Sequence, residues 1–189
     1  MACSIYFNRH QREWVAEALE KAEALVGGYF RLDVADPDRF PYDLRTLATL
    51  RGHEKTRRAF AQVCKYEIRR EAEDSHPRSR EFYRICLQDD KILNAIQAEP
   101  PQILKPLLLY VLTHEIIHVT RFSLDPGRFY LDPREKGVEE KYVHRKTYEI
   151  LASFGDPSVE PLLERYRPWW GESGPAAQGP GLDNPGTRV

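Results

Sequence analysis

Two histidines and a glutamate lie close together in one strongly apolar segment of the chain. His114, Glu115 and His118 fall within residues 107–122, whose sequence is LLLYVLTHEIIHVTRF. If this segment is a helix, His114 and His118 project from the same side, one turn apart, because they are four residues apart. Two imidazoles placed in this way can bind one zinc ion through their ring nitrogens. Glu115 is rotated from its neighbours by about 100° per residue, so it borders the site and can take a proton from a water molecule on the metal.

The segment that carries these residues has the composition of a core helix. Apolar side chains cover more of its surface than the single face that a surface helix buries. Pro106 stands at its front edge, where a proline removes no needed hydrogen bond, and residues 125–127 supply turn chemistry after it. Polar groups are costly in such a helix unless something satisfies them. A bound metal is one explanation, and core histidines with ordinary hydrogen-bond partners are the other.

Length and charge bound the class of protein. The chain has 189 residues and a formal net charge of −1. This balance gives no electrostatic reason to expect binding to nucleic acid or to an anionic membrane. We expect one domain over residues 1–170, long enough to bury a sizeable core, and a disordered Gly- and Pro-rich tail over residues 171–189.

Cysteine usage and hydropathy both favour the cytoplasm. The three cysteines are scattered, show no CxxC spacing and favour a reducing compartment: Cys3, Cys64 and Cys86. We expect no signal peptide at the start of the chain. The most apolar run, residues 103–119, is interrupted by Lys105 and by the His114-Glu115 pair. The run therefore predicts a buried helix of a soluble protein and no membrane span.

Hydrophobic periodicity predicts a helix and then a strand in the N-terminal part. Residues 9–26 carry an amphipathic helical stripe, with Asn8 as a plausible N-cap and the glycine pair at 27–28 as a stop signal. Residues 29–34 alternate between apolar and charged side chains, which is a strand pattern. Residues 42–50 are ambiguous, and their leucine spacing leans towards a helix.

A β-hairpin is expected in the middle of the chain. Residues 64–68 and 83–87 both alternate between apolar and polar side chains. The charged segment 71–80 between them contains a His-Pro pair, which is a loop signal. Residues 59–68 also fit a helical stripe, so the pattern of the first strand is not unique.

Three further helical segments are expected. The first runs to Ile96 and could be capped by Asp89 and Asp90. The second is a strong helix over residues 138–154, ended by Gly155, and the third is a short piece over residues 158–167. The residues expected to face inward from the strong helix are Val143, Ile150, Leu151 and Phe154. Trp169 and Trp170 are expected to anchor the last piece.

A catalytic zinc site needs a third protein ligand and one open position for water. The helix over residues 138–154 offers three candidates near its start. We rank Glu140 first, Glu139 second and His144 third. The ordinary alternative for a glutamate there is a solvated side chain that the helix dipole favours.

The HExxH pattern followed by a glutamate resembles the gluzincin group of zinc metallopeptidases. In that group, HExxH on one helix is completed by a glutamate about twenty residues later on the next helix; Glu139 and Glu140 follow His118 by 21 and 22 residues. The resemblance covers residues 107–154, roughly a quarter of the chain. It implies an α+β, helix-rich, zincin-like domain whose small antiparallel or mixed sheet packs on the HExxH helix, and it implies Zn²⁺ as the cofactor.

The chain departs from that group at one position. The group often places an acidic residue four positions after the ligand glutamate, where it orients the first histidine, but this chain has His144 there. His144 could orient that histidine, contact substrate or be a ligand itself. Relatives with the longer HExxHxxGxxH pattern are excluded, because Arg121 and Leu124 occupy its glycine and last histidine. The group binds extended substrate along an edge strand, for which the candidate here is residues 83–88.

The leading hypothesis is zinc-dependent hydrolysis of peptide bonds in a peptide or protein substrate. Zinc held by His114, His118 and Glu140 would lower the pKa of its bound water, and Glu115 would act as the general base. Further groups could touch the substrate or stabilise the oxyanion: Tyr130, Tyr142 and His144.

Two other functions stay open. The chain could be a non-catalytic, zinc-stabilised peptide- or protein-binding module of zincin-like fold, which a closed coordination by four protein ligands would favour. It could also be a metal-free helical interaction protein with core histidines. The sequence identifies neither the substrate nor the oligomeric state.

Overall fold

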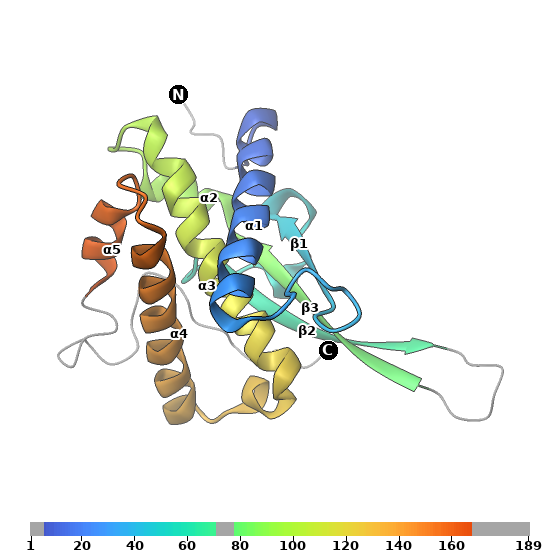
Figure 1. Ribbon diagram of the computed structural model, residues 1–189. Coiled ribbons are helices and arrows are strands. Elements are labelled where there is room, and N and C mark those ends of the chain that lie inside the picture. Colours follow the sequence, from blue (N-terminus) through green and yellow to red (C-terminus); the bar gives the residue numbers. More distant parts are fainter. Residues whose placement is uncertain (1–5, 71–77, 168–189) are drawn as a thin grey trace.

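The fold is α+β, as the sequence predicts: helices pack against one small mixed sheet (Figure 1). The computed structural model describes residues 6–70 and 78–167. The elements are α1 (Arg9–Phe30), β1 (Tyr42–Thr46), η1 (Leu47–Thr49), η2 (Gly52–Glu54), β2 (Ala61–Arg70), β3 (Arg78–Leu87), α2 (Asp89–Ala95), η3 (Pro101–Ile103), α3 (Leu104–Leu124), η4 (Pro126–Tyr130), α4 (Pro133–Phe154) and α5 (Glu160–Tyr166).

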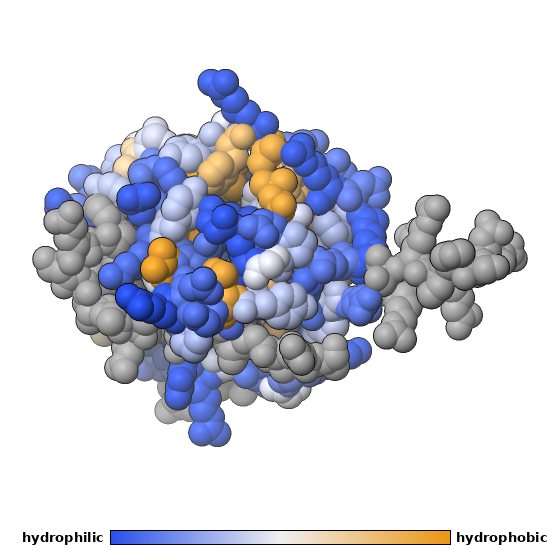
Figure 2. Space-filling model, turned by 90° about the horizontal axis from the view of Figure 1, so that it is seen from below, coloured by the Kyte–Doolittle hydropathy of each residue, from blue (hydrophilic) through white to orange (hydrophobic). Residues whose placement is uncertain are grey.

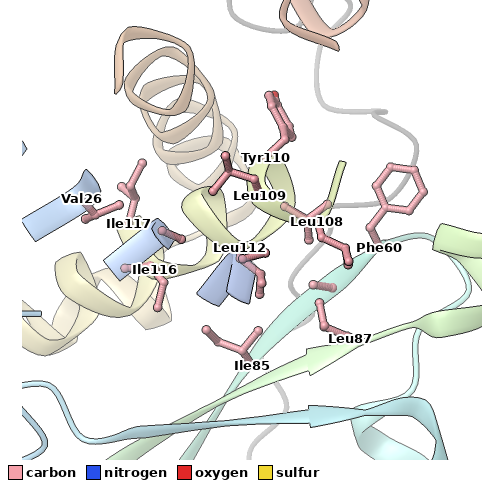
Figure 3. Packing of buried hydrophobic residues seen from close by; sticks show 14 of the residues in the cluster. Val26, Phe60, Ile85, Leu87, Leu108, Leu109, Tyr110, Leu112, Ile116 and Ile117 are labelled. Carbon is pink, nitrogen blue, oxygen red and sulfur yellow. The ribbon is translucent and has the colours of Figure 1, made fainter. Parts of the chain in front are cut away.

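Helix α3 is the central element of the fold, which confirms the predicted core helix. It contacts α1, α4, α5 and β2. Four of its residues are not buried: Lys105, Arg121, Ser123 and Leu124. Figure 3 shows Leu112 facing Ile85 and Leu87 of β3. On the opposite side of the helix, Val26 of α1 lies beside Ile117. The helix is long and apolar enough to cross a membrane by composition, but 89% of its most apolar window is buried inside the protein.

Helix α1 begins as predicted but runs four residues further. Asn8 accepts a hydrogen bond from the Gln11 backbone in a capping box. The glycine pair does not stop the helix, which ends at Phe30, with Arg31 in the left-handed conformation. Gly27 instead permits close packing, because a Cβ there would lie 2.7 Å from the Leu32 carbonyl oxygen. The strand predicted over residues 29–34 is wrong, because its first residues complete α1 and the rest form a loop.

The predicted hairpin is confirmed as β2 and β3. The two strands pair antiparallel, with Val63 opposite Ile85, and β1 pairs parallel with β3. The strand order is β1-β3-β2, so β3 is the middle strand and the prediction of residues 83–88 as an edge strand is wrong. The far end of the hairpin projects from the body of the molecule (Figure 1). Residues 71–77 of the predicted loop lie outside the described residues, and residues 78–80 belong to β3.

The helical leaning of residues 42–50 is also wrong. The segment forms β1 and then the short 3-10 helix η1. Leu47 and Leu50 pack together with Cys64 and Cys86 on the sheet face away from α3. A 3-10 turn therefore produces the same leucine spacing that an α-helix would.

Helix α4 begins five residues earlier than predicted. Asp132 is its N-cap and forms a capping box with Glu135, and Pro133 occupies the first turn. Its predicted end at Gly155, in the left-handed conformation, is confirmed. Of the four residues predicted to face inward, Val143, Ile150 and Leu151 are buried, but Phe154 is 38% exposed, so that part of the prediction is wrong.

The two short helices are confirmed with small changes. α2 is present, but Asp89 does not cap it: its carboxylate accepts hydrogen bonds from the backbone of Phe7 and Leu47. α5 is shorter than the predicted 158–167. The tryptophan pair 169–170 and the tail 171–189 lie outside the described residues.

Figure 2 shows the hydropathy of one face of the molecule. On the described part of the face in Figure 2, most residues are hydrophilic and the hydrophobic ones form small, separate groups.

Candidate metal centre

The two histidines of α3 converge on one point. His114 and His118 lie one helical turn apart, and their Nε2 atoms are 3.1 Å from each other. The ring centroids are 4.8 Å apart. Both side chains are buried, and His114 is 0% exposed. Two imidazole nitrogens aimed at each other need a shared proton or a cation between them.

Glu140 of α4 completes this cluster, as the first-ranked candidate. One of its carboxylate oxygens lies 3.2 Å from His118 Nε2 and the other 3.4 Å from His114 Nε2. Among the described residues, His114, His118 and Glu140 form the one group of potential metal ligands whose ligand atoms all lie within 4.8 Å of one another.

The separations between these atoms are close to those around a tetrahedral zinc ion. Zinc–nitrogen and zinc–oxygen bonds of about 2.0–2.1 Å in a tetrahedron place the ligand atoms about 3.3–3.4 Å apart. Here the two Nε2 atoms are 3.1 Å apart, and the two oxygens of the Glu140 carboxylate lie one each against His118 Nε2 at 3.2 Å and against His114 Nε2 at 3.4 Å. Two neutral imidazoles and one carboxylate are also the donor types that zinc takes in catalytic sites. The three residues therefore fit the metal in the types of their donor atoms and in their convergence, because one ligand atom from each lies within 4.8 Å of the others.

The charges of the cluster are strongly coupled in the metal-free chain. Burial acts to raise the pKa of Glu140, but the two histidines outweigh it and hold that pKa well below its usual range. Burial acts to lower the pKa of His118, but Glu140 outweighs it and raises the pKa. For His114 burial wins, and its pKa is lowered. The carboxylate of Glu140 thus stays ionised, as a metal ligand must be.

Glu115 borders the same site without joining the ligand cluster. It lines a small hollow with His114, His118 and Glu140, and residues 61–63 of β2 form the rest of the wall. Burial raises the pKa of Glu115 to about 8; Glu140 adds to this rise and His118 opposes it. A buried carboxyl group beside the ligand cluster is positioned to exchange a proton with a molecule in the hollow.

Glu139, the second candidate for the third ligand, binds arginines instead. Arg121 donates through Nε to one carboxylate oxygen and through Nη2 to the other at 2.8 Å, and Arg128 Nη1 donates at 3.1 Å. Burial acts to raise the pKa of Glu139, but these guanidinium groups lower it. Both oxygens of the Glu139 carboxylate thus accept hydrogen bonds from arginines and not from the histidine cluster.

His144, the third candidate, lies beside the cluster but outside it. Its ring centroid is 4.5 Å from that of His114, and its Nδ1 is 3.1 Å from the hydroxyl of Tyr110. Burial lowers the pKa of His144 to about 3, and the charge of His114 adds to this effect. His144 is therefore a neutral neighbour of His114.

The other two candidate donors make contacts with residues outside the cluster. Tyr130 is 60% exposed at the end of η4, with the ammonium of Lys65 over its ring. The ring of Tyr142 lies under the guanidinium of Arg121, 3.9 Å from its centroid. Neither tyrosine lines the hollow that contains Glu115.

Three features of the site escaped the sequence reasoning. Residues 61–63 line the hollow, but a strand that packs across a helix leaves no local signal in the sequence. Arg121 and Arg128 bind Glu139 from 18 and 11 residues away, so their spacing predicts no contact. Tyr110 could have been found, because it lies four residues before His114 and shares its helical stripe.

Comparisons of the chain with protein-family models, with curated proteins and with solved structures find no match.

Proposed function

We propose that this chain is a zinc-dependent metallopeptidase in which His114, His118 and Glu140 hold the metal and Glu115 is the general base. The observation that carries the proposal is the convergence of two imidazoles from α3 and one carboxylate from α4, with one ligand atom from each within 4.8 Å of the others. Glu115 lines the hollow beside them, where the substrate carbonyl and the attacking water would meet.

The residues of the chain have separate tasks in this proposal. Bound zinc would lower the pKa of a coordinated water and polarise the substrate carbonyl. The positive charge of a bound zinc ion would favour the carboxylate form of Glu115 despite its burial, and in that form Glu115 takes a proton from the attacking water and returns it to the leaving amine. The burial of Glu115 and His114 keeps bulk water away from these groups, which strengthens the electrostatic interactions between them.

Strand β2 is the element on which we propose that substrate binds. Among the described strands it has a neighbour on one side only, and its residues 61–63 form a wall of the hollow. The free edge of a strand offers backbone N–H and C=O groups to an extended peptide. Residues 61–63 are only 1–3% exposed, so the accessible stretch of this edge begins beyond them, at residues 65–67. This position suits a peptide or protein substrate better than a compact small molecule.

One observation favours a second function, a non-catalytic module that zinc holds together. The hollow is small, and both His114 and Glu115 are almost fully buried. Closed coordination would need a fourth protein ligand, however, and His144 is not part of the ligand group. Three protein ligands with one open position are the arrangement of catalytic zinc sites.

Glu115→Gln separates the two functions. The variant keeps the ligand cluster and removes the base, so it should bind one zinc per chain and cleave a mixture of unstructured peptides at least about 100-fold more slowly than the wild type, because general bases contribute about 10²–10⁴-fold. Unchanged cleavage by the variant would refute the role of Glu115. A zinc-loaded wild type that cleaves no peptide would support the binding module.

A further inference from the structure

A buried tyrosine on α3 reaches the metal centre through one intermediate residue. Tyr110 lies one turn before His114, and its hydroxyl is 3.1 Å from Nδ1 of His144 on α4. The ring of Tyr110 stacks on Tyr166 of α5, with centroids 4.8 Å apart. The ring of Tyr110 is thus held by stacking, and its hydroxyl is held by a hydrogen bond.

The two facing helices carry contacts at successive levels. His144 follows Glu140 by one turn of α4, just as His114 follows Tyr110 by one turn of α3. At one level His114 meets Glu140, and at the next Tyr110 meets His144. The ring of His144 also lies 4.5 Å from that of His114, at an interplanar angle of 54°. The Tyr110–His144 pair is therefore in direct contact with the His114–Glu140 pair.

We propose that Tyr110 is a positioning residue of the metal centre: its hydroxyl fixes the ring of His144, and that ring in turn holds His114 and the adjoining turn of α4 in the ligating arrangement. The inference rests on the proposed zinc site. Residues behind a ligand commonly set its orientation and the metal affinity. Here a hydrogen bond between two buried side chains of different helices would set the orientation of the ligand, and it would also fix the register of α3 against α4.

The zinc affinity of Tyr110→Phe tests this inference. The variant keeps the ring that stacks on Tyr166 and removes only the hydroxyl. We expect a zinc dissociation constant about fivefold higher, measured by competition with a chromogenic chelator, which is about 1 kcal/mol and the usual net contribution of one hydrogen bond. Tyr42→Phe is the matched control, because it removes a hydroxyl that binds Glu23. The affinity of this control should stay within a factor of about two.

A second background shows whether Tyr110 acts through His144. In a His144→Leu protein, Tyr110→Phe should cause no further loss of affinity, because the residue that transmits the effect is already gone. The thermal midpoint of each metal-free protein shows that it is folded. If His144→Leu does not fold, the zinc affinities of Tyr110→Phe and Tyr42→Phe decide whether Tyr110 acts on the metal centre.

The outcomes separate this inference from the proposed function. Wild-type protein that binds no zinc would overturn both. Wild-type protein that binds zinc, with an unchanged affinity in Tyr110→Phe, would overturn the role of Tyr110 alone. An equal loss in the wild-type and His144→Leu backgrounds would also overturn it, because Tyr110 would then act through packing and not through His144.

Discussion

Substitution of two adjacent glutamates of α4 should have opposite effects: one variant should lose zinc binding, and the other should lose stability in the metal-free protein. Glu140 faces the two histidines, and Glu139 faces Arg121 and Arg128. Glu140→Gln and Glu139→Gln are chemically identical changes, one residue apart on the same helix. Each removes one negative charge and is nearly isosteric, so each variant is the control for the other.

The size of the zinc response follows from mass action. At free zinc 100-fold above the dissociation constant, binding to the folded state adds about 2.7 kcal/mol to stability. A chain of this length shifts its thermal midpoint by about 2–4 °C per kcal/mol. The wild-type midpoint should therefore rise by about 5–11 °C. If Glu140→Gln weakens zinc binding about 100-fold, the same zinc concentration adds only about 0.4 kcal/mol, and the midpoint should rise by about 1–2 °C.

Glu139→Gln should show the reverse behaviour. It leaves Arg121 without its carboxylate partner, at a position where Glu139 is 6% exposed. Because Arg128 is partly exposed, the cost should lie below that of a fully buried pair, at about 2 kcal/mol. Its metal-free midpoint should fall by about 4–8 °C, while its zinc response should match that of the wild type.

Calorimetric unfolding with chelator-buffered zinc measures all three proteins under the same conditions. The assignment of the third ligand would be wrong if Glu139→Gln lost the zinc response and Glu140→Gln kept it. The metal site itself would be wrong if none of the three proteins responded to zinc.

Two further predictions concern the framework that holds the site. Glu54 accepts hydrogen bonds from Tyr66 and Arg84; although burial opposes them, these contacts lower its pKa from 4.5 to about 2. The contribution of Glu54 to stability is therefore complete above about pH 4.5 and is lost as the pH falls towards 2. Over this window, urea unfolding should show that the stability of the wild type falls by about 3 kcal/mol more than that of Glu54→Gln. Parallel pH profiles of the two proteins would contradict this prediction. The side chain of Leu112 is 0% exposed and faces β3. Leu112→Ala should therefore lower the free energy of unfolding, measured by the same method, by about 2–5 kcal/mol. A loss below about 1 kcal/mol would show that the contact between α3 and the sheet is not the core.

Most of the fold follows from local signals, because the strongest elements carry both a periodicity and a cap. Helix α3 is predicted by its apolar composition, and α1 by its stripe and Asn8. The failures occur where tertiary packing decides between local alternatives. The glycine pair at 27–28 signals a helix end, but Gly27 serves a close contact with the Leu32 carbonyl inside a longer helix. Residues 42–50 carry a leucine spacing that a strand followed by a 3-10 turn satisfies equally well.

The arrangement of the candidate site is predictable only where it depends on helical spacing. His114 and His118 are four residues apart, so any helix brings them together. The choice between Glu139 and Glu140 depends on the rotation of α4 about its axis, which the arginines at 121 and 128 help to fix. The order of the strands is a long-range property, and the hairpin pattern alone leaves open which strand lies at the edge.

The metal content of the wild-type protein, purified without a histidine tag, tests the central claim most directly. We predict one zinc ion per chain in the wild type and loss of that zinc in His118→Ala, which removes one of the three ligands. Wild-type protein without stoichiometric metal, or a His118→Ala protein that retains its zinc, would contradict the account.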